Sequence, residues 1–160
     1  GKIRLTLDSD KVPAMGLTQR SIYLARYMGD KVASDNEVAV SIVLLPDFTG
    51  MESAAEGVAP TMALSATELD LGEFEKKSKL SGIFTITNKG RTTRTISRLQ
   101  VFNRAIGVNL GDSSIPAGET VKLKVTVTKE ELANDKNPLR ILLITNDPSQ
   151  PKQTLTLKVK

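Results

Sequence analysis

The stretch KLKVTVT, residues 122–128, alternates apolar side chains with basic or hydroxyl ones. An alternation of period two places the apolar side chains on one face of an extended chain: Leu123, Val125 and Val127. The stretch TLTLKVK, residues 154–160, repeats this pattern with Leu155, Leu157 and Val159 on its apolar face. Both stretches predict β-strands with one buried face, and so an all-β domain built from packed sheets.

The segment between these strands predicts a third strand and one short helix. LRILLIT, residues 139–145, is apolar on both faces, which is typical of a strand in the middle of a sheet. NDPSQP, residues 146–151, predicts a turn, because Asn and Asp bond to nearby backbone and Pro cannot join a β-ladder. Thr128 and Glu131 have the spacing of a capping box and predict a single helical turn over KEELAN, residues 129–134.

Upstream residues predict a hairpin and a short edge strand. In LSGIFTIT, residues 80–87, the large apolar side chains share one face: Leu80, Phe84 and Ile86. NKG, residues 88–90, predicts left-handed turn positions that lead into a second strand from Thr92. TELDLGEF, residues 67–74, predicts a short edge strand that ends at Gly72.

A partial internal repeat connects the two ends of the chain. KIRLTL, residues 2–7, matches residues 122–127 at an offset of 120, and the same offset places Arg20, Ile22 and Leu24 on Arg140, Leu142 and Ile144. We therefore expect residues 1–46 to repeat the last three strands of a later module and to lack its leading strands.

The repeat and the local composition predict the domain organisation. GMESAAEGVAPT, residues 50–61, is rich in small residues and predicts a linker. We expect a C-terminal half-module over residues 1–48, a linker over 49–61 and a complete module over 62–160. The predicted fold class is therefore all-β, with β-sandwich modules in tandem and the first one truncated.

Composition excludes several kinds of chemistry. The 160 residues include no His and no Cys. This rules out Ser-His-Asp and Cys-His nucleophiles, ordinary zinc sites and disulfides within the chain. We expect no enzymatic activity, no catalytic residues, no bound metal and no cofactor. No apolar run approaches the roughly 18 residues of a transmembrane helix, so no membrane span is expected in this chain.

The motifs of residues 62–160 resemble a known family. LSATELDLGEF (64–74), GIFTITNKGR (82–91), IPAGETVKLKVTV (115–127) and LLITNDPSQPKQTLTLKV (142–159) resemble the bacterial immunoglobulin-like family of unknown function. Its members read D-F-G, F-x-F-T-N-x-G, P-G-E and T-N-D-P, and the family is similar to Hydin-type (ASH) modules. Many members carry an S-C-G-C-T segment, whereas LQVFNRAIGV (99–108) has no Cys, so no role of those cysteines is implied.

The resemblance implies a seven-strand immunoglobulin-like sandwich without an established activity. It also implies an exported bacterial protein in the periplasm, on the cell surface or secreted. A non-catalytic structural or interaction module of the cell envelope is the function we expect. The expected partner is a protein or an envelope component.

Three short motifs are candidates for chemical sites. Asp8 and Asp10 offer carboxylates for calcium, but a calcium site needs six or more oxygens and Lys11 opposes a cation. Glu73 and Glu75 lack a second catalytic group set across a cleft. Residues 149–152, SQPK, have Ser-x-x-Lys spacing, but Pro151 and the turn composition disfavour the helix that this chemistry requires.

Basic residues gather in one part of the sequence and suggest an alternative function. Residues 72–104 hold eight Lys or Arg against Glu73 and Glu75: Lys76, Lys77, Lys79, Lys89, Arg91, Arg94, Arg98 and Arg104. Their clustering indicates a candidate surface for a carbohydrate or polyanion, with Arg94 and Arg98 on one sheet face. Nucleic acid is not expected as a partner, because aromatic residues make up only 4% of the chain.

Apolar residues near the N-terminus indicate a second candidate surface. Five of them lie on strands that the half-module leaves without a covering sheet: Ile3, Leu5, Leu7, Ile22 and Leu24. Burying such side chains stabilises a fold by about 1.5–3 kcal/mol each, so an uncovered set favours a partner. A homodimer through residues 1–46 is one expected arrangement.

Overall fold

A computed structural model describes residues 2–12, 14–49 and 62–160 of the chain. The chain divides into two compact units, Gly1–Leu44 and Leu45–Lys160, which are described separately. The linker predicted over residues 49–61 lies outside the described residues except for Thr49.

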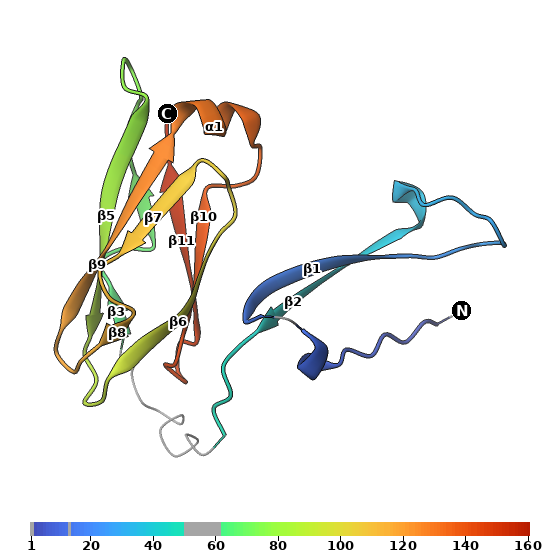
Figure 1. The fold of residues 1–160 in the computed structure, drawn as a ribbon, viewed down its shortest axis with the longest axis horizontal. Coiled ribbons are helices and arrows are strands. Elements are labelled where there is room, and N and C mark those ends of the chain that lie inside the picture. Colours follow the sequence, from blue (N-terminus) through green and yellow to red (C-terminus); the bar gives the residue numbers. More distant parts are fainter. Residues whose placement is uncertain (1, 13, 50–61) are drawn as a thin grey trace. The chain divides into compact units, whose positions relative to one another are not determined.

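The second unit is a sandwich of two β-sheets (Figure 1). The four-stranded sheet has the order β3 (Met62–Leu64), β5 (Lys79–Asn88), β9 (Thr120–Thr128), β7 (Ile106–Leu110). The five-stranded sheet has the order β4 (Glu68–Asp70), β11 (Lys152–Lys158), β10 (Arg140–Thr145), β6 (Arg94–Val101), β8 (Ser114–Ile115). The predicted all-β sandwich is confirmed, and the short strands β3, β4 and β8 explain why these residues hold more than seven strands.

The period-two alternation predicts the core correctly. Of the residues assigned to the inner face, only Val159 is merely half-buried, and the others are at most 6% exposed: Leu80, Phe84, Ile86, Leu123, Val125, Val127, Leu155 and Leu157. These side chains come from both sheets and belong to one hydrophobic cluster. The core therefore lies between the sheets, as expected for strands that each have one apolar face.

The segment LRILLIT forms β10 in the middle of the five-stranded sheet, as predicted. β10 pairs antiparallel with both β11 and β6. Ile141 and Leu143 point into the core cluster, whereas Leu142 and Ile144 are buried but do not belong to it. The strand predicted near Glu68 is confirmed as an edge strand, β4, which pairs parallel with β11.

The predicted hairpin after β5 is wrong. β5 pairs with β3 and β9 in one sheet, whereas β6 pairs with β10 and β8 in the other. Asn88 and Gly90 do not have the positive φ expected of them. Instead the Asn88 side chain is fully buried and donates to the carbonyls of Thr92 and Ile115, each over 2.8 Å. These bonds hold the chain as it crosses from one sheet to the other.

The short helix forms where the sequence predicts it, although its cap differs. α1 covers Lys129–Asn134, and Thr128 occupies the N-cap position without a side-chain hydrogen bond. The capping-box interaction predicted for Thr128 and Glu131 is therefore not made. Within the described part of the chain, no helix has the length and apolar character that crossing a membrane requires.

The first unit is a β-hairpin with two short 3-10 turns. β1 (Gly16–Tyr23) pairs antiparallel with β2 (Glu37–Leu44), and the turns cover Ser9–Lys11 and Ser34–Asn36. The strand predicted over residues 2–7 does not form. The reason lies in its counterpart β9, which is hydrogen-bonded between β5 and β7. Among the described residues, no strands lie beside residues 2–7 as β5 and β7 lie beside β9. Within that part of the chain, residues 2–7 therefore cannot form the hydrogen bonds of a β-ladder.

The offset of the repeat also changes within the first unit. Ile3 and Leu5, the counterparts of core residues Leu123 and Val125, line one cavity together with Ile22 and Leu24. At an offset of 120, Ile22 and Leu24 would match Leu142 and Ile144, which lie outside the core cluster. An offset of 119 matches them to Ile141 and Leu143, which lie inside it. The gap-free register is therefore wrong, because one extra residue before β1 reverses which side chains face inward.

Candidate interaction surfaces

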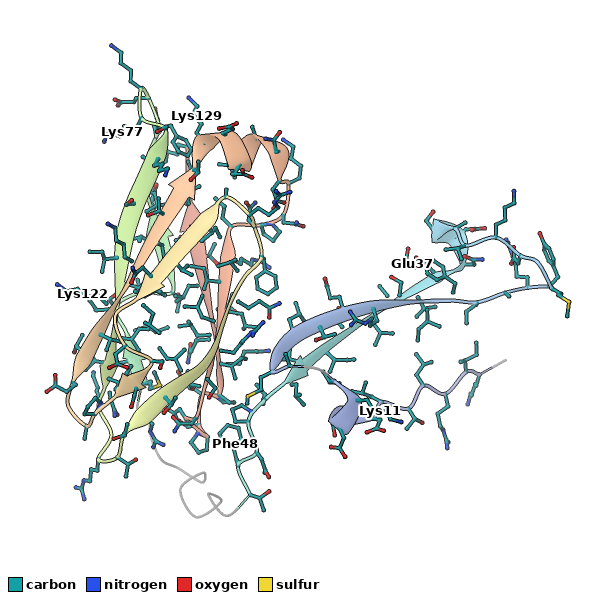
Figure 2. The ribbon with its side chains drawn as sticks, viewed as in Figure 1. Lys11, Glu37, Phe48, Lys77, Lys122 and Lys129 are labelled. Carbon is teal, nitrogen blue, oxygen red and sulfur yellow. The ribbon has the colours of Figure 1, made fainter. Side chains whose placement is uncertain are left out.

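The eight basic residues do not form one surface. Lys76 and Lys77 lie in the turn before β5, whereas Lys89 and Arg91 follow its last residue. A strand of ten residues spans roughly 33 Å, so these two groups lie at opposite ends of the sandwich. Figure 2 shows Lys77 near Lys129 of α1, well separated from Lys122 on β9. The sequence cluster thus reflects the course of β5 and not a patch.

The two arginines of β6 do not share a face. The pairing of β6 with β10 shifts at Ile144/Thr145, where Ile144 opposes Arg98 and Thr145 opposes Ile96. Ile96 is a core residue and Arg98 is exposed, so this β-bulge breaks the alternation. Arg94 is half-buried and its guanidinium donates to the Asn146 carbonyl over 3.5 Å. Their predicted common face is therefore wrong.

Arg104 lies in the loop between β6 and β7 and takes part in a loop contact through its backbone. Its backbone N–H donates to Asp135 Oδ2 over 2.8 Å, and the N–H of Asn137 donates to Oδ1 over 2.9 Å. These two hydrogen bonds hold the pKa of Asp135 below its usual value. The side chain of Arg104 remains exposed, at the same end of the sandwich as α1.

The three motifs considered as chemical sites all lie in turns. Asp8 accepts a hydrogen bond from the backbone of Asp10 and forms an exposed ion pair with Lys11 at 3.2 Å. Glu73 and Glu75 are exposed on either side of buried Phe74. The described residues contain no group of three or more acidic side chains placed to hold a metal ion.

Ser149, the first residue of the Ser-x-x-Lys motif, belongs to a turn organised by Asp147. Asp147 is 1% exposed, and its Oδ1 accepts hydrogen bonds from the N–H of Ser149 over 3.0 Å and from its hydroxyl over 2.6 Å. The sequence indicates a turn here but does not indicate that its carboxylate is buried. A D-P-S pattern alone is equally compatible with an exposed turn, so the long-range partner of Asp147 could not be predicted.

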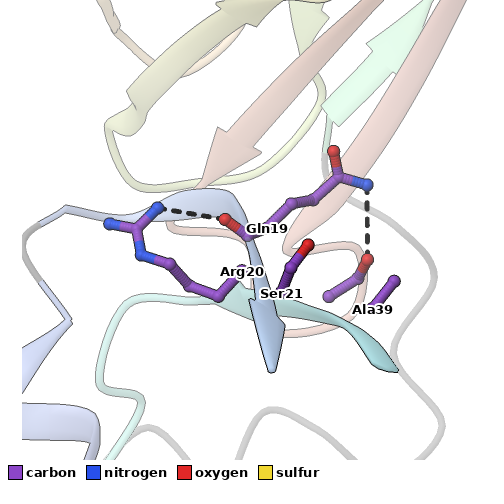
Figure 3. A pocket seen from close by; sticks show the side chains of 5 residues that line it. Gln19, Arg20, Ser21 and Ala39 are labelled. Atoms are coloured by element: carbon purple, nitrogen blue, oxygen red, sulfur yellow. Dashed lines mark hydrogen bonds between the residues drawn. The ribbon is translucent and has the colours of Figure 1, made fainter. Parts of the chain in front are cut away.

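The hairpin of the first unit has one polar face and one apolar face. The polar face carries Gln19, Ser21, Ala39 and Ser41, which together with Arg20 line an open depression of about 340 Å³ (Figure 3). Gln19 Nε2 donates to Ser41 Oγ over 3.3 Å, and Arg20 Nη1 donates to the Gln19 carbonyl over 3.0 Å. The hydroxyl of Ser21 donates to Glu37 beside the depression, so these polar groups already have hydrogen-bond partners.

The apolar face carries the candidate residues near the N-terminus. A cavity of about 130 Å³ is lined by Ile3, Leu5, Ile22, Leu24 and Val38. Ile3 is 67% exposed and Leu5 52%, whereas their counterparts Leu123 and Val125 in the second unit are 0% exposed. Leu7 is also exposed, and Ile22 is half-buried. The structure therefore brings all these residues except Leu7 around one open cavity.

The loop after β1 adds further exposed apolar side chains on a fixed backbone. Asp30 accepts hydrogen bonds from the backbone N–H and the Nε of Arg26, both over 3.0 Å, and the Arg26 guanidinium lowers the pKa of Asp30. Asn36 closes the loop through the carbonyl of Lys31 and the N–H of Ala33. The loop held by these hydrogen bonds carries two exposed apolar side chains that the sequence did not indicate as part of a contact surface: Met28 and Val32.

Comparisons with known proteins agree with this architecture. Residues 60–160 match the family described as HYDIN/CFA65/VesB-like, Ig-like domain. A protein of unknown function from Porphyromonas gingivalis W83 has a TM-score of 0.67 at 20% identity, over 94% of this chain and 68% of that chain. At this level of identity the likeness concerns the fold. None of the curated proteins matches the chain.

Two proteases from Vibrio cholerae are similar at a lower level. The VesB protease has a TM-score of 0.49 at 15% identity, over 71% of this chain and 35% of that chain. The secreted serine protease VesC has a TM-score of 0.43 at 11% identity, over 78% of this chain and 27% of that chain. This chain therefore spans about a third or less of the length of either protease.

Proposed function

Because the chain belongs to the HYDIN/CFA65/VesB-like Ig-like domain family through residues 60–160, we propose that it is a non-catalytic interaction module that binds a protein partner. The observation that carries this proposal is the open apolar face of the first unit, where Ile3 and Leu5 are more than half exposed above Ile22, Leu24 and Val38. Large exposed apolar sets of this kind are typical of protein contact surfaces.

The polar side chains of the second unit support a structural and non-catalytic role. Its buried polar residues satisfy backbone groups at turns: Asn88, Asn103, Thr145 and Asp147. Among the described residues, no buried side-chain nitrogen or oxygen lacks a hydrogen-bond partner. Groups used in this way are not available as a nucleophile or a base.

The alternative, a carbohydrate- or polyanion-binding surface around residues 76–104, has less support. A polyanion binds best to positive charges that act together over a short distance. Here Lys76 and Lys89 are separated by the length of β5, and Arg94 and Arg98 occupy different faces. For these reasons we favour the protein contact over the basic surface.

Binding of a hydrophobic dye such as ANS tests the open apolar face. The dye should fluoresce with the unmodified chain at low protein concentration, and the double variant Leu5→Lys/Leu24→Lys should lose most of that signal. Thr6→Lys is the matched control, because Thr6 alternates with Leu5 and should leave the signal unchanged. Equal fluorescence of all three proteins would contradict the proposal.

A panel of ester, peptide and glycoside substrates tests the non-catalytic assignment. We expect no turnover above that of the buffer. Turnover that the variant Glu73→Gln or Glu75→Gln abolishes would contradict the assignment, since these exposed carboxylates are the candidate acid and base.

For localisation we propose export to the periplasm, the cell surface or the medium. The proposal rests on the resemblance of the motifs in residues 62–160 to modules of exported proteins. Immunodetection in fractionated source cells tests it, and a signal confined to the cytoplasm would contradict it.

A further inference from the structure

Residues 2–7 belong to no strand, although their apolar and polar residues alternate as in one. No backbone hydrogen bond joins residues 2–7 to another described residue, and the first 3-10 turn begins only at Ser9. The equivalent strand of the second unit, β9, is paired along both edges, with Phe84 opposite Leu123 on one side and Leu110 opposite Leu123 on the other. The first unit therefore offers a segment with the alternation of a strand and with backbone groups that no other described residue pairs.

We propose that two copies of this chain pair through residues 2–8 as antiparallel strands, with Leu5 opposite Leu5 of the second copy. This inference rests on the proposed function, because it names the protein that binds the apolar face. A two-fold axis beside Leu5 makes the contact self-complementary, as an isologous dimer requires.

The sequence of the segment fits this register on both faces. Ile3 lies opposite Leu7 of the second copy, so all the apolar side chains of both strands fall on the face toward their hairpins. Arg4 lies opposite Thr6 of the second copy on the other face. At each end Lys2 lies opposite Asp8 of the second copy, which places opposite charges together where exposed cross-strand pairs are favourable.

Neighbouring registers are less favourable. A shift by one residue would place apolar side chains opposite polar ones along the whole pair. A pairing centred on Arg4 would oppose two guanidinium groups. A pairing centred on Thr6 would place Ile3 opposite Ser9, which belongs to the 3-10 turn, and would leave that apolar side chain unpaired. The register centred on Leu5 pairs all of residues 2–8.

The surroundings of Asp8 leave room for an ion pair with Lys2 of the second copy. Asp8 already forms an ion pair with Lys11 at 3.2 Å, and the Asp8 side chain remains 51% exposed. Lys2 of a second copy can therefore reach the same carboxylate from solvent. In the dimer, Ile3, Leu5 and Leu7 of one copy would contact the same residues of the other copy along the shared edge. Ile22 and Val38 of each hairpin would pack beneath them.

Single-cysteine variants of the 160-residue chain test the register directly, because the chain contains no cysteine. Directly opposed Cβ atoms on antiparallel strands are about 4.5–5.5 Å apart, close enough for a disulfide after small adjustments. Leu5→Cys should therefore form a disulfide-linked dimer when treated with oxidised glutathione. Leu7→Cys alone is the matched control and should not, since its two introduced thiols lie four residues apart along the pair.

A mixture of two single-cysteine variants provides a second crosslinking test of the register. Ile3→Cys and Leu7→Cys should each form no disulfide-linked dimer under oxidation, whereas their equimolar mixture should give disulfide-linked mixed dimers. Thr6→Cys reports on the competing register, and faster crosslinking of Thr6→Cys than of Leu5→Cys would overturn the proposed pairing. Equal crosslinking of all variants would indicate random collision and would also overturn it.

Sedimentation equilibrium measures the association without crosslinking. The unmodified chain should show a concentration-dependent dimer, and Lys2→Glu should raise its dissociation constant roughly tenfold, because two ion pairs per dimer become repulsive. The double variant Lys2→Glu/Asp8→Lys should restore the dimer. A chain that remains monomeric at all concentrations, or a double variant that associates as weakly as Lys2→Glu, would overturn the proposal.

Dye binding separates a failure of this inference from a failure of the proposed function. If the dimer forms, ANS fluorescence per chain should fall as protein concentration rises. A monomeric chain that binds the dye at every concentration would overturn the homodimer and leave the open face for a different protein. A monomeric chain that never binds the dye would overturn both.

Discussion

The carboxylate of Asp147 accepts a hydrogen bond from the backbone N–H of Met62, with 3.1 Å between the nitrogen and Oδ2, across 85 positions of sequence. The contact is buried and joins the turn between β10 and β11 to the first residue of β3. The Asp147 side chain thus holds the start of the four-stranded sheet against the β10–β11 turn of the five-stranded sheet.

Asp147→Ala should lower the stability of the second unit. The substitution leaves the N–H groups of Met62 and Ser149 without their acceptor, and a buried unpaired donor costs about 1–3 kcal/mol. Chemical denaturation monitored by circular dichroism measures the change. Ser149→Ala is the matched control and should cost about 1 kcal/mol or less, since it removes only one hydroxyl hydrogen bond. Equal losses in the two variants would contradict the role given to the carboxylate.

Gly82→Ala should destabilise the sandwich because the space beside Gly82 is filled. A Cβ atom there would lie 2.5 Å from Leu69 Cδ2 and 2.7 Å from Leu71 Cδ2, so both leucines would have to move. Overpacking of this kind costs roughly 1–3 kcal/mol. Gly107→Ala is the control, because its nearest neighbour, the Thr126 carbonyl, is 3.9 Å away. It should be neutral or stabilise by about 0.4–1 kcal/mol, as thermal unfolding would show.

Glu75→Gly should stabilise the turn before β5. Glu75 has a φ of 44°, which is unfavourable for a residue with a Cβ atom and costs about 1–2 kcal/mol. Part of that gain is offset by the greater freedom of glycine in the unfolded chain, so we expect a net increase of roughly 0.5–1 kcal/mol. Glu73→Gly has the same change of charge without a positive φ and should destabilise. A higher melting temperature for Glu73→Gly than for Glu75→Gly would contradict the strain.

The second unit should lose stability in acid partly through Asp135. The N–H groups of Arg104 and Asn137 lower its pKa in the folded chain, so the folded state holds the proton less tightly than the unfolded state, where the pKa is about 3.9. The stabilisation is complete above that pH and decreases as the pH falls through the lower, folded value. Asp135→Asn should flatten this part of the acid denaturation curve. A curve as steep as that of the unmodified chain would contradict the assignment.

Local alternation was enough to predict the core and most of the strands. Leu123, Val125 and Leu155 face inward because period two is a property of each strand by itself. The crossing from β5 to β6 could not be predicted, because Asn-Lys-Gly is compatible with a hairpin and with a change of sheet. Which of the two forms depends on the acceptors of the buried Asn88 side-chain amide. One acceptor is the carbonyl of Ile115, 27 positions away.

The residues of the two candidate surfaces come together to different degrees for a similar reason. The apolar residues Ile3, Leu5, Ile22 and Leu24 meet around one cavity, because alternation defines their face. The basic residues do not meet, since a run of charges in sequence carries no information about the length of β5 or the bulge in β6. The single extra residue before β1 also could not be predicted. It lies in a loop, and the alternation of apolar residues does not determine the length of a loop.

The parallel pairing of β4 with β11 has a mechanical consequence. β4 begins the five-stranded sheet in sequence and β11 ends it, and the two are joined by hydrogen bonds from Thr156 to Thr67 and from Leu71 to Lys158. Because the strands run in the same direction, tension applied before β4 and after β11 pulls them past each other along their axes. The hydrogen bonds of this pair are then loaded together in shear and cannot open one after another as in a peeled hairpin. The five-stranded sheet therefore resists stretching along the chain best at the point where its first and last strands meet.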